Sequence, residues 1–430
     1  MIVVNELSCR NAKITDFSNT ELEKLVSSLD NLNIPIHNWY NFKEGYSHHF
    51  PLWLLDYLHE NYGFIPSQAL DPFMGSGTSL LSLAERDISC DGVEYNPFIF
   101  WMAKVKLTAH LIPKLELLNA FKSIDLCGSR NSKLNIPNLS TFRNNKYFKE
   151  SYLNKILDIR DQIRKSEYST RIKDLLLLAL IDALNEATSL KKDGRALRYL
   201  NDKITVDPKL GFTDWFYRMY DDLDVCKTHR ASRFKHVLVN DSALSSTNKI
   251  YATTNKYDLV LFSPPYLNGF DYSEIYKLEL WLLEFVKHNE EWLNLRRNSV
   301  QSHWSVKFEE KNVYKKLHPD ATIFNNILSD ICDGTLNGST KRVKLMIDGF
   351  VEDMHKLFSN LNRVVKPGGY TAYMVSTSMY GNHHVETDLL MAEIAENNGF
   401  ELQEIIILKK RRSRVNGSFI IRDSVIILKK

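Results

Sequence analysis

The octapeptide DPFMGSGT at residues 71–78 constrains the fold of this chain more than any other segment. An apolar run, 65–70, precedes it, and a run with helical character, 79–84, follows it. This order predicts a strand, a tight turn and a helix. Gly75 and Gly77 permit a sharp turn and let a ligand approach the backbone, because neither carries a Cβ. The helix then directs its free N–H groups and positive dipole end toward that ligand, which predicts a cofactor site.

The turn is unsuited to a phosphate-rich cofactor. Leu80 stands where a dinucleotide fingerprint needs a third small residue, and the pattern GxxxxGK followed by Ser or Thr is missing. The next predicted strand, 88–94, ends in Glu94, where a carboxylate can accept hydrogen bonds from a ribose diol. S-adenosylmethionine, which has a ribose and an amino-acid moiety but no phosphate, fits better than NAD or ATP. The alternative is a purely structural turn followed by an unrelated acid.

A second motif, SPPY at residues 263–266, follows the apolar segment 259–262. An exocyclic amine on a nucleobase is a poor nucleophile, because its lone pair is delocalised into the ring. The Ser263 hydroxyl and the Pro264 carbonyl, held rigidly by Pro264 and Pro265, can accept the protons of such an amine. Tyr266 offers a ring on which an extruded base can stack. The alternative is a stiff loop that ends a strand, since Pro-Pro pairs commonly mark turns.

Together the two motifs resemble motifs I and IV of the DNA amino-methyltransferases. The resemblance extends to motif X at 39–57, motif II at 94–97, motif III at 240–242 and motif VI at 364–375. It implies a Rossmann-like class I methyltransferase core with a seven-stranded, mostly parallel sheet and helical insertions. Alternating apolar strands and helices independently favour an α/β sheet. The resemblance also implies S-adenosylmethionine as cofactor, double-stranded DNA as substrate and a cognate restriction endonuclease as partner.

Serine at the first position of motif IV is similar to the cytosine-N4 branch of the family, whereas adenine-N6 enzymes usually carry Asp or Asn there. We therefore expect methyl transfer to the N4 amine of a flipped cytosine in a restriction–modification system. An adenine-N6 or RNA-directed enzyme, and a non-catalytic module that binds S-adenosylmethionine and nucleic acid, remain as alternatives. The predicted catalytic residues are Ser263, Pro264, Pro265 and Tyr266. The predicted cofactor-binding residues are Asp71, Phe73, Gly75, Ser76, Gly77, Thr78, Glu94, Asn96, Asp241 and Ser242, with Ser47 and Phe50 as further neighbours.

The motif spacing divides the chain into five segments. Residues 1–109 hold the motif X-like segment and the first half of the core, and 110–235 form a helical insertion. Residues 236–284 return to the core, 285–340 form a second insertion, and 341–430 complete the core. Either insertion could recognise the DNA target.

Basic residues indicate where DNA could bind, because Lys and Arg contacts to phosphates supply most sequence-independent affinity. Residues 141–235 hold 20 Lys and Arg against 14 Asp and Glu, although a solvated helical surface would look the same. A second cluster is expected in a loop between two closing antiparallel strands, at 405–408 and 425–428. The predicted DNA-binding residues are Lys409, Lys410, Arg411, Arg412 and Arg414 in that cluster, and Arg296 and Arg297 in the second insertion.

Composition and spacing also make several other classes improbable. No apolar run approaches 18 residues, and the first residues lack a basic and apolar leader, so we expect neither a membrane protein nor a secreted one. Five scattered cysteines without a CxxC pair favour reduced thiols in a prokaryotic cytoplasm. The pairs His48-His49 and His383-His384 lack a further ligand at metal-binding spacing, so no metal is expected.

Overall fold

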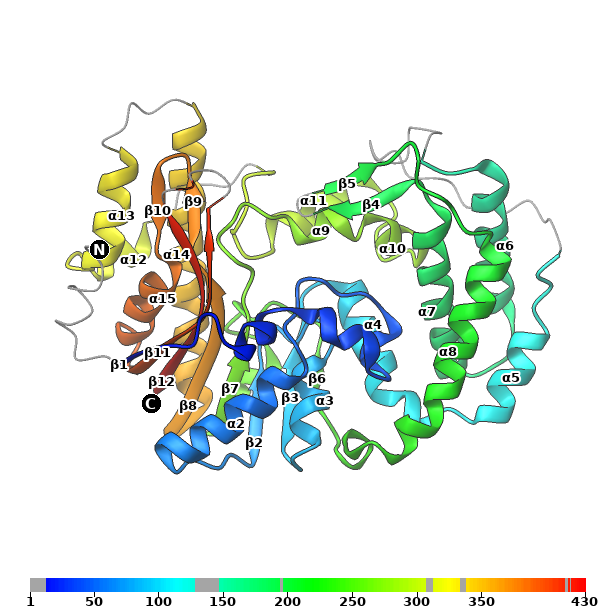
Figure 1. Cartoon of the computed structure of the whole chain (residues 1–430), viewed down its shortest axis with the longest axis horizontal. Helices are drawn as coiled ribbons and strands as arrows, with labels where there is room; N and C mark the ends of the chain where they lie inside the picture. The colour runs from blue at the N-terminus through cyan, green and yellow to red at the C-terminus, as the bar shows by residue number, and fades with distance from the viewer. Residues whose placement is uncertain are drawn as a thin grey trace.

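The computed structural model describes residues 13–127, 147–193, 196–306, 312–332, 338–413, 417 and 419–430. It has two lobes, one around a large twisted sheet and one made mainly of helices (Figure 1). The first and last strands that the structure describes, β1 (Lys13–Asp16) and β12 (Ile420–Lys429), both lie in the sheet lobe. Among the described residues, no helix combines the length and apolarity that crossing a bilayer requires.

The core is an eight-stranded, mixed but largely parallel sheet, as expected for a Rossmann-like methyltransferase fold. Four adjoining strand pairs, from β8 through β7, β2 and β3 to β6, are parallel, whereas β12 runs antiparallel to both β8 and β11. The antiparallel closing pair predicted from the sequence is thus confirmed. In spatial order the strands are β1 (Lys13–Asp16), β11 (Glu401–Arg412), β12 (Ile420–Lys429), β8 (Val365–Ser376), β7 (Tyr257–Phe262), β2 (Gln68–Asp71), β3 (Ser89–Val93) and β6 (Leu238–Val239).

The predicted count of seven strands was one too low. The additional strand, β1, pairs in parallel with the N-terminal half of β11. Thr15 and Lys13 of β1 both contact the carboxylate of Glu404 on β11, which is fully buried. Tyr57 and Tyr62 donate hydrogen bonds to the same carboxylate, at 2.9 and 2.7 Å. Short polar segments such as β1 carry little strand signal, so tertiary pairing decides their structure.

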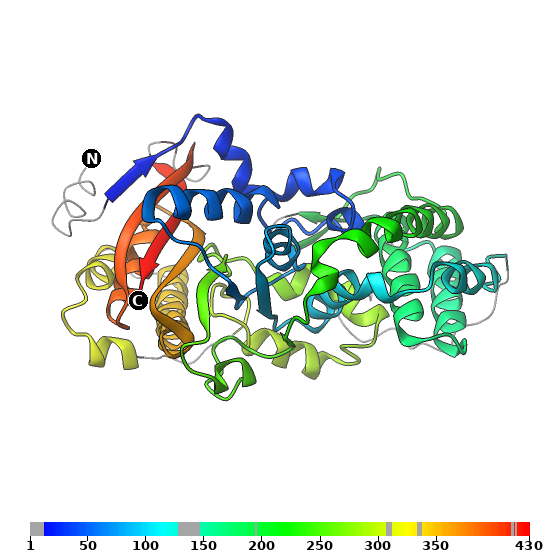
Figure 2. The same ribbon diagram turned by 90° about the horizontal axis from the view of Figure 1, so that it is seen from below.

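Two hydrophobic cores lie on opposite faces of the sheet, because successive strand residues point in opposite directions. In β7, Leu259 and Leu261 join one core, while Val260 and Phe262 join the other. The first core includes α2 (His49–Tyr62), α3 (Thr78–Ala84) and α4 (Pro97–Thr108). The second includes α14 (Gly338–Val364) and α15 (Thr387–Glu396), and Figure 2 shows α2 and α14 on opposite sides of the sheet.

The helical lobe lies within residues 110–235, the segment that the sequence assigns to an insertion. Its apolar stripes pack into the first core rather than into a separate one, so the lobe is continuous with the sheet region. Its elements are α5 (Lys114–Lys122), α6 (Glu150–Lys165), α7 (Thr170–Ala187), the hairpin of β4 (Leu190–Asp193) and β5 (Ala196–Tyr199), and α8 (Pro208–Thr228).

The chain between β7 and β8 forms a series of short helices before α14. They are α9 (Tyr272–Ile275), α10 (Lys277–Leu282), α11 (Asn289–Arg297), α12 (Val313–Leu317) and α13 (Thr322–Cys332). Strands β9 (Ser378–Tyr380) and β10 (His383–Val385) form a separate hairpin. The 3-10 helices are η1 (Glu21–Val26), η2 (Ser28–Asn33), η3 (His37–Trp39), η4 (Ala109–Leu111), η5 (Arg230–Arg233) and η6 (Lys249–Ala252).

Candidate functional site

The glycine turn forms between β2 and α3, where the sequence predicted it. Gly75 has φ +51°, and a Cβ placed there would lie 2.9 Å from Cε1 of Phe42. Gly77 has φ +84° and forms the N-terminal cap of α3. Both positions therefore require glycine, the first through conformation and close approach and the second through conformation.

Two carboxyl groups organise this turn, that of Asp71, which is buried, and that of Glu94, which is partly buried. Asp71 accepts a 2.9 Å hydrogen bond from the Phe73 backbone N–H and a second bond from the Ser79 hydroxyl. Glu94, just after β3, accepts hydrogen bonds from the backbone N–H groups of Gly75, at 3.2 Å, and Asn96, at 2.7 Å. Burial raises the pKa of Asp71 and that of Glu94 to about 7, because desolvation penalises the charged form.

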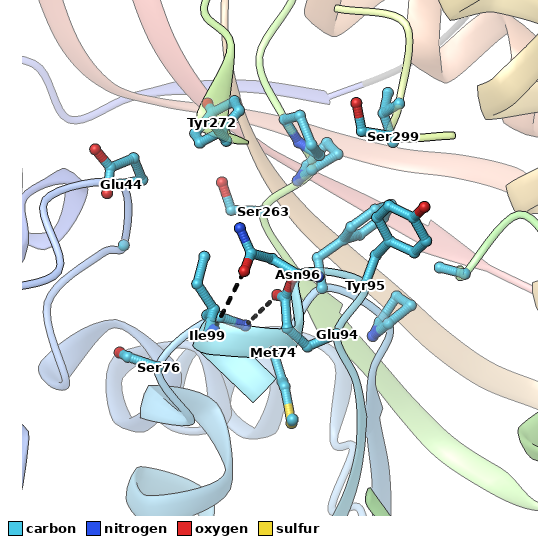
Figure 3. A pocket seen from close by; sticks show the side chains of 18 of the residues that line it. Glu44, Met74, Ser76, Glu94, Tyr95, Asn96, Ile99, Ser263, Tyr272 and Ser299 are labelled. Carbon is cyan, nitrogen blue, oxygen red and sulfur yellow. Dashed lines mark hydrogen bonds between the residues drawn. The ribbon is translucent and has the colours of Figure 1, made fainter. Parts of the chain in front are cut away.

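The SPPY segment begins immediately after β7, which is the parallel neighbour of β2. The carboxyl ends of parallel strands meet along one side of a sheet, where open α/β folds bind ligands. Figure 3 shows Ser263 close to Glu94 and Asn96, with Tyr272 and Glu44 farther around the same space. Segments nearly 190 residues apart in the sequence are thus brought to one place.

These segments line a single cavity with about 1070 Å³ of empty space. Most of the predicted site residues contribute to its wall. They are Asp71, Phe73, Gly75, Ser76, Thr78, Glu94, Asn96, Ser242, Ser263, Pro264 and Pro265. Of the described residues that line the cavity, none is Lys or Arg, while Glu44, Asp71 and Glu94 are acidic.

Within the predicted catalytic and cofactor-binding sets, apart from the further neighbours Ser47 and Phe50, three residues do not line the cavity: Gly77, Asp241 and Tyr266. Gly77 instead faces Ala103 and Leu107 of α4, at the start of the helix. Asp241 accepts a 2.7 Å hydrogen bond from the backbone N–H of Ser242, its neighbour. The Tyr266 ring packs against the second core, and burial raises the pKa of its hydroxyl.

Asn96 has a structural role that its position in the sequence did not reveal. Its side-chain oxygen accepts hydrogen bonds of 3.1 and 3.4 Å from the backbone N–H groups of Phe98 and Ile99 (Figure 3). Asn96 thus caps the N-terminal end of α4. The carboxamide nitrogen remains on the side of the cavity. Asn96 can therefore position α4 and also present a donor to a ligand.

The sequence did not identify several residues that complete the wall. Phe42, Glu44 and Tyr46 line the cavity, whereas the predicted neighbours Ser47 and Phe50 are fully buried elsewhere. Burial raises the pKa of Glu44, which accepts a hydrogen bond from the Tyr276 hydroxyl. The second insertion contributes Asn298, Ser299, Ser302 and His303 to the wall. Tyr272, from the core segment before it, also lines the cavity. Only the position of the segment 39–57, shortly before the glycine motif, could have indicated that Phe42, Glu44 and Tyr46 line the cavity.

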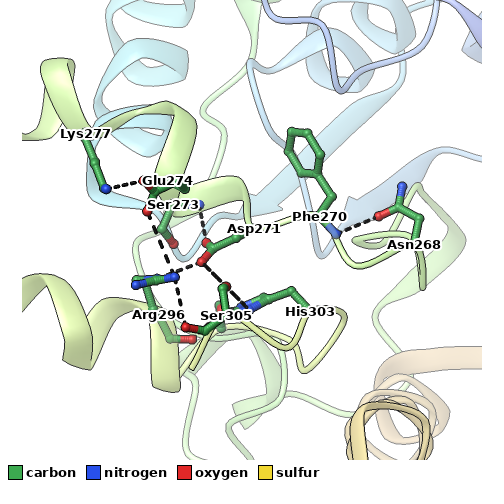
Figure 4. A network of polar contacts seen from close by, with 10 residues as sticks. Asn268, Phe270, Asp271, Ser273, Glu274, Lys277, Arg296, His303 and Ser305 are labelled. Atoms are coloured by element: carbon green, nitrogen blue, oxygen red, sulfur yellow. Dashed lines mark hydrogen bonds and ion pairs between the residues drawn. The ribbon is translucent and has the colours of Figure 1, made fainter. Parts of the chain in front are cut away.

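The structure corrects the assignment of Arg296 to DNA binding. Arg296 is buried, and its Nε lies 2.7 Å from Oδ2 of Asp271 (Figure 4). Ser305 donates a 2.6 Å hydrogen bond to the same oxygen, and His303 Nδ1 lies 3.8 Å from it. Burial raises the pKa of Asp271, but the charges of His303 and Arg296 outweigh that effect and hold it below its usual value. Arg296 therefore anchors α11 beside the cavity, while Arg297 is exposed.

The C-terminal basic cluster also differs from the prediction. Residues 409–412 extend β11 instead of forming a loop, because they continue to pair with β12 as far as Arg412 and Ile420. Lys410 forms an ion pair with Asp16, and Arg411 with Asp423, so these two charges are partly neutralised. Lys409 is half-buried and Arg412 exposed, and Arg414 lies outside the described residues.

The parallel sheet and the cavity at the carboxyl ends of its strands define a Rossmann-like methyltransferase fold. No protein-family model matches the chain. The chain is similar to the type II methyltransferase M.BsoBI of Geobacillus stearothermophilus, with 27% identity over 97% of this chain and 90% of that protein. It is also similar to the type II methyltransferase M.AvaI of Nostoc sp., with 24% identity over 90% of this chain and 83% of the relative.

A third relative, the type II methyltransferase M.MjaII of Methanocaldococcus jannaschii, is 25% identical over 56% of this chain and 45% of its own length. The first two alignments extend over both insertions as well as the core, since they cover nine-tenths of the chain or more. Fold and similarity together support a methyltransferase.

Proposed function

We propose that this chain is a site-specific DNA methyltransferase of a restriction–modification system. It would use S-adenosylmethionine to methylate the N4 amine of a cytosine extruded from double-stranded DNA. One observation carries the proposal: the glycine turn and the SPPY segment open into the same cavity. A donor site and an acceptor site for group transfer must lie within reach of each other, and a shared cavity meets that condition.

The charge of the cavity supports S-adenosylmethionine as the cofactor. Among the described residues of the wall, three acidic side chains and the lack of Lys and Arg suit a cation and disfavour polyphosphates. Glu94 would accept hydrogen bonds from the ribose hydroxyls, and the bare backbone at Gly75 would let the ligand approach. Glu44, on another wall, could balance a positively charged part of the ligand. When bound, S-adenosylmethionine supplies an electrophilic methyl group carried on a sulfonium.

The SPPY segment supports an exocyclic amine as the acceptor. The Ser263 hydroxyl and the Pro264 carbonyl would accept the two amine protons and direct the nitrogen lone pair toward the donor side of the cavity. Alignment of this kind can contribute roughly 7–11 kcal/mol toward lowering a barrier. The Tyr266 ring packs against the second core and does not line the cavity, so we assign it no stacking of the extruded base. Serine at position 263 favours cytosine N4 over adenine N6, through the resemblance given above.

The substrate base must leave the duplex, because its amine is engaged in pairing there. Arg297, Arg412 and Lys409 remain candidates for phosphate contacts, whereas Arg296 does not. Residues of the second insertion line the cavity near Ser263, which supports a role for that insertion near the target base.

The test is methyl transfer by the purified chain. Tritiated S-adenosylmethionine and unmethylated DNA should give labelled DNA, and digestion to nucleosides should yield 4-methylcytosine. Recovery of 6-methyladenine would instead establish the adenine alternative. Absence of label in the parent chain, with DNA binding intact, would favour a non-catalytic module. The control is Ser263→Ala, which should bind cofactor and transfer little methyl.

A further inference from the structure

Three side chains with metal-binding chemistry meet outside the cavity described above. His37 lies in η3, His48 directly precedes α2, and Glu85 caps the C-terminal end of α3. One donor atom from each lies within 4.8 Å of the other two. None of the three lines the candidate active site. This group could not be predicted from the sequence, because its members are 11 and 37 residues apart.

Two of these groups are buried without a hydrogen-bond partner. Within the part of the chain that the structure describes, neither Nε2 of His37 nor Nδ1 of His48 has one. Both side chains are less than a tenth exposed. A buried polar atom without a partner is costly, and its presence in a folded protein needs an explanation. Two such atoms beside a carboxylate are explained by a bound cation.

The chemistry of the three side chains suits a cation. Imidazole nitrogens and carboxylate oxygens are common ligands of metal ions in proteins. Lys106, a cationic neighbour of His37, donates a 3.2 Å hydrogen bond to the His37 carbonyl and so engages the backbone.

Neighbouring histidines orient the ligands. Nε2 of His48 lies 3.0 Å from Nε2 of His49, which leaves Nδ1 of His48 as its free donor atom. Nδ1 of His229 accepts a hydrogen bond from the Ala231 backbone N–H, so the ring proton of His229 sits on Nε2. This Nε2 lies 3.7 Å from Oε1 of Glu85. Such outer contacts fix the orientation of metal ligands.

We propose that His37, His48 and Glu85 bind one divalent transition-metal ion of the zinc class. Two imidazole nitrogens and one carboxylate form the mixed nitrogen and oxygen set that Zn²⁺ accepts, with water in the fourth position. Ligand atoms on a tetrahedral zinc lie about 3.4 Å apart, given bonds of roughly 2.0–2.1 Å. Binding therefore draws the three donors inward by side-chain rotation.

The ion has a structural role. It ties η3 and the start of α2 to the far end of α3, the helix that begins at the glycine turn. Seven helical residues, roughly 10 Å, separate the two ends of α3. The metal would thus stabilise the packing behind the cofactor-binding turn without touching a substrate.

Titration of tag-free, EDTA-treated protein with Co²⁺, followed by visible absorption and then Zn²⁺ competition, tests this site. We expect one equivalent of ion, displacement of Co²⁺ by Zn²⁺, and a rise in melting temperature with Zn²⁺. Glu85→Gln and His37→Gln should each weaken binding at least tenfold. His59→Gln, an exposed histidine in the same helix as His49, is the matched control and should bind like the parent.

Glu85 is the decisive position, because its side chain is 38% exposed and its replacement by Gln preserves size. No saturable binding by the parent would overturn the proposal. Unchanged affinity in a folded Glu85→Gln variant, checked by circular dichroism, would also overturn it. Neither result depends on methyl transfer, so the metal site and the proposed function fail or succeed separately.

Discussion

The partly buried carboxyl group of Glu94 should make cofactor binding depend on pH near neutrality. Burial raises the pKa of Glu94 from 4.5 to about 7. The hydrogen bonds that the carboxylate accepts from the backbone N–H groups of Gly75 and Asn96 only partly offset that rise. The ribose hydroxyls of S-adenosylmethionine would donate to the ionised carboxylate. Charge-assisted hydrogen bonds of this kind favour the charged form. Cofactor binding should therefore release a proton from Glu94.

The expected magnitude follows from that pKa. At about pH 8 roughly nine in ten Glu94 side chains are ionised, and at about pH 6 roughly one in ten. Affinity should therefore fall about tenfold between these pH values, or about 1.4 kcal/mol. The stability of the ligand-free protein should change in the opposite sense. The raised pKa favours the folded state fully below about pH 4.5, and this contribution is lost as pH rises through about 7.

Calorimetric titration in two buffers of different ionisation enthalpy measures both the affinity and the proton released. Glu94→Gln should bind weakly and lose most of the pH dependence. Asp71 has a similarly raised pKa and lies close enough to influence Glu94, so the two titrate as a coupled pair. Asp71→Asn is therefore the companion variant. Equal affinity of the parent at pH 6 and pH 8, or a full slope in Glu94→Gln, would refute the assignment.

Other predictions concern turnover, backbone conformation and a buried ion pair. Ser263→Ala should lower kcat at least tenfold, about 1.4 kcal/mol, and leave cofactor affinity unchanged in a titration; intact turnover would contradict its hydrogen-bonding role. Gly75→Ala should weaken cofactor binding and lower stability by about 1–2 kcal/mol. The control is Gly63→Ala, which should lower only stability, because Gly63 has a similar φ but open space around it. Arg296→Ala should lower the free energy of unfolding by about 3–5 kcal/mol in urea, because the buried Asp271 carboxylate would lose its guanidinium partner. Arg297→Ala should change stability little and reduce the salt dependence of DNA binding.

The sequence predicted the strand ends well, because both motifs follow strongly apolar strands. Once β2 and β7 are neighbours in a parallel sheet, Gly75 and Ser263 must lie at the same side of it. The fold class and the shared cavity are therefore consequences of local signals. The antiparallel pair of β11 and β12 was predictable for the same reason, since both contain runs of isoleucine, leucine and valine.

What the sequence could not predict depends on contacts between distant residues. From the sequence, Arg296 would be placed on the surface, but in the structure it is buried where it pairs with Asp271, 25 residues earlier, and lies over the Trp292 ring. The strand at 409–412 is basic and carries no strand signal, yet pairing with β12 extends it. Glu44 lies in the cavity because Tyr276, more than 200 residues away, hydrogen-bonds to it. The meeting of His37, His48 and Glu85 likewise depends on tertiary packing.

The pairing of β1 with β11 has a practical consequence for aggregation. β1 covers main-chain donors and acceptors of β11 beside Ile405, Ile406 and Ile407. A chain shortened past Asp16 would present these three isoleucines on an open strand, which can template addition of another polypeptide. Such a truncated protein should self-associate with increasing concentration, even if the cavity is intact.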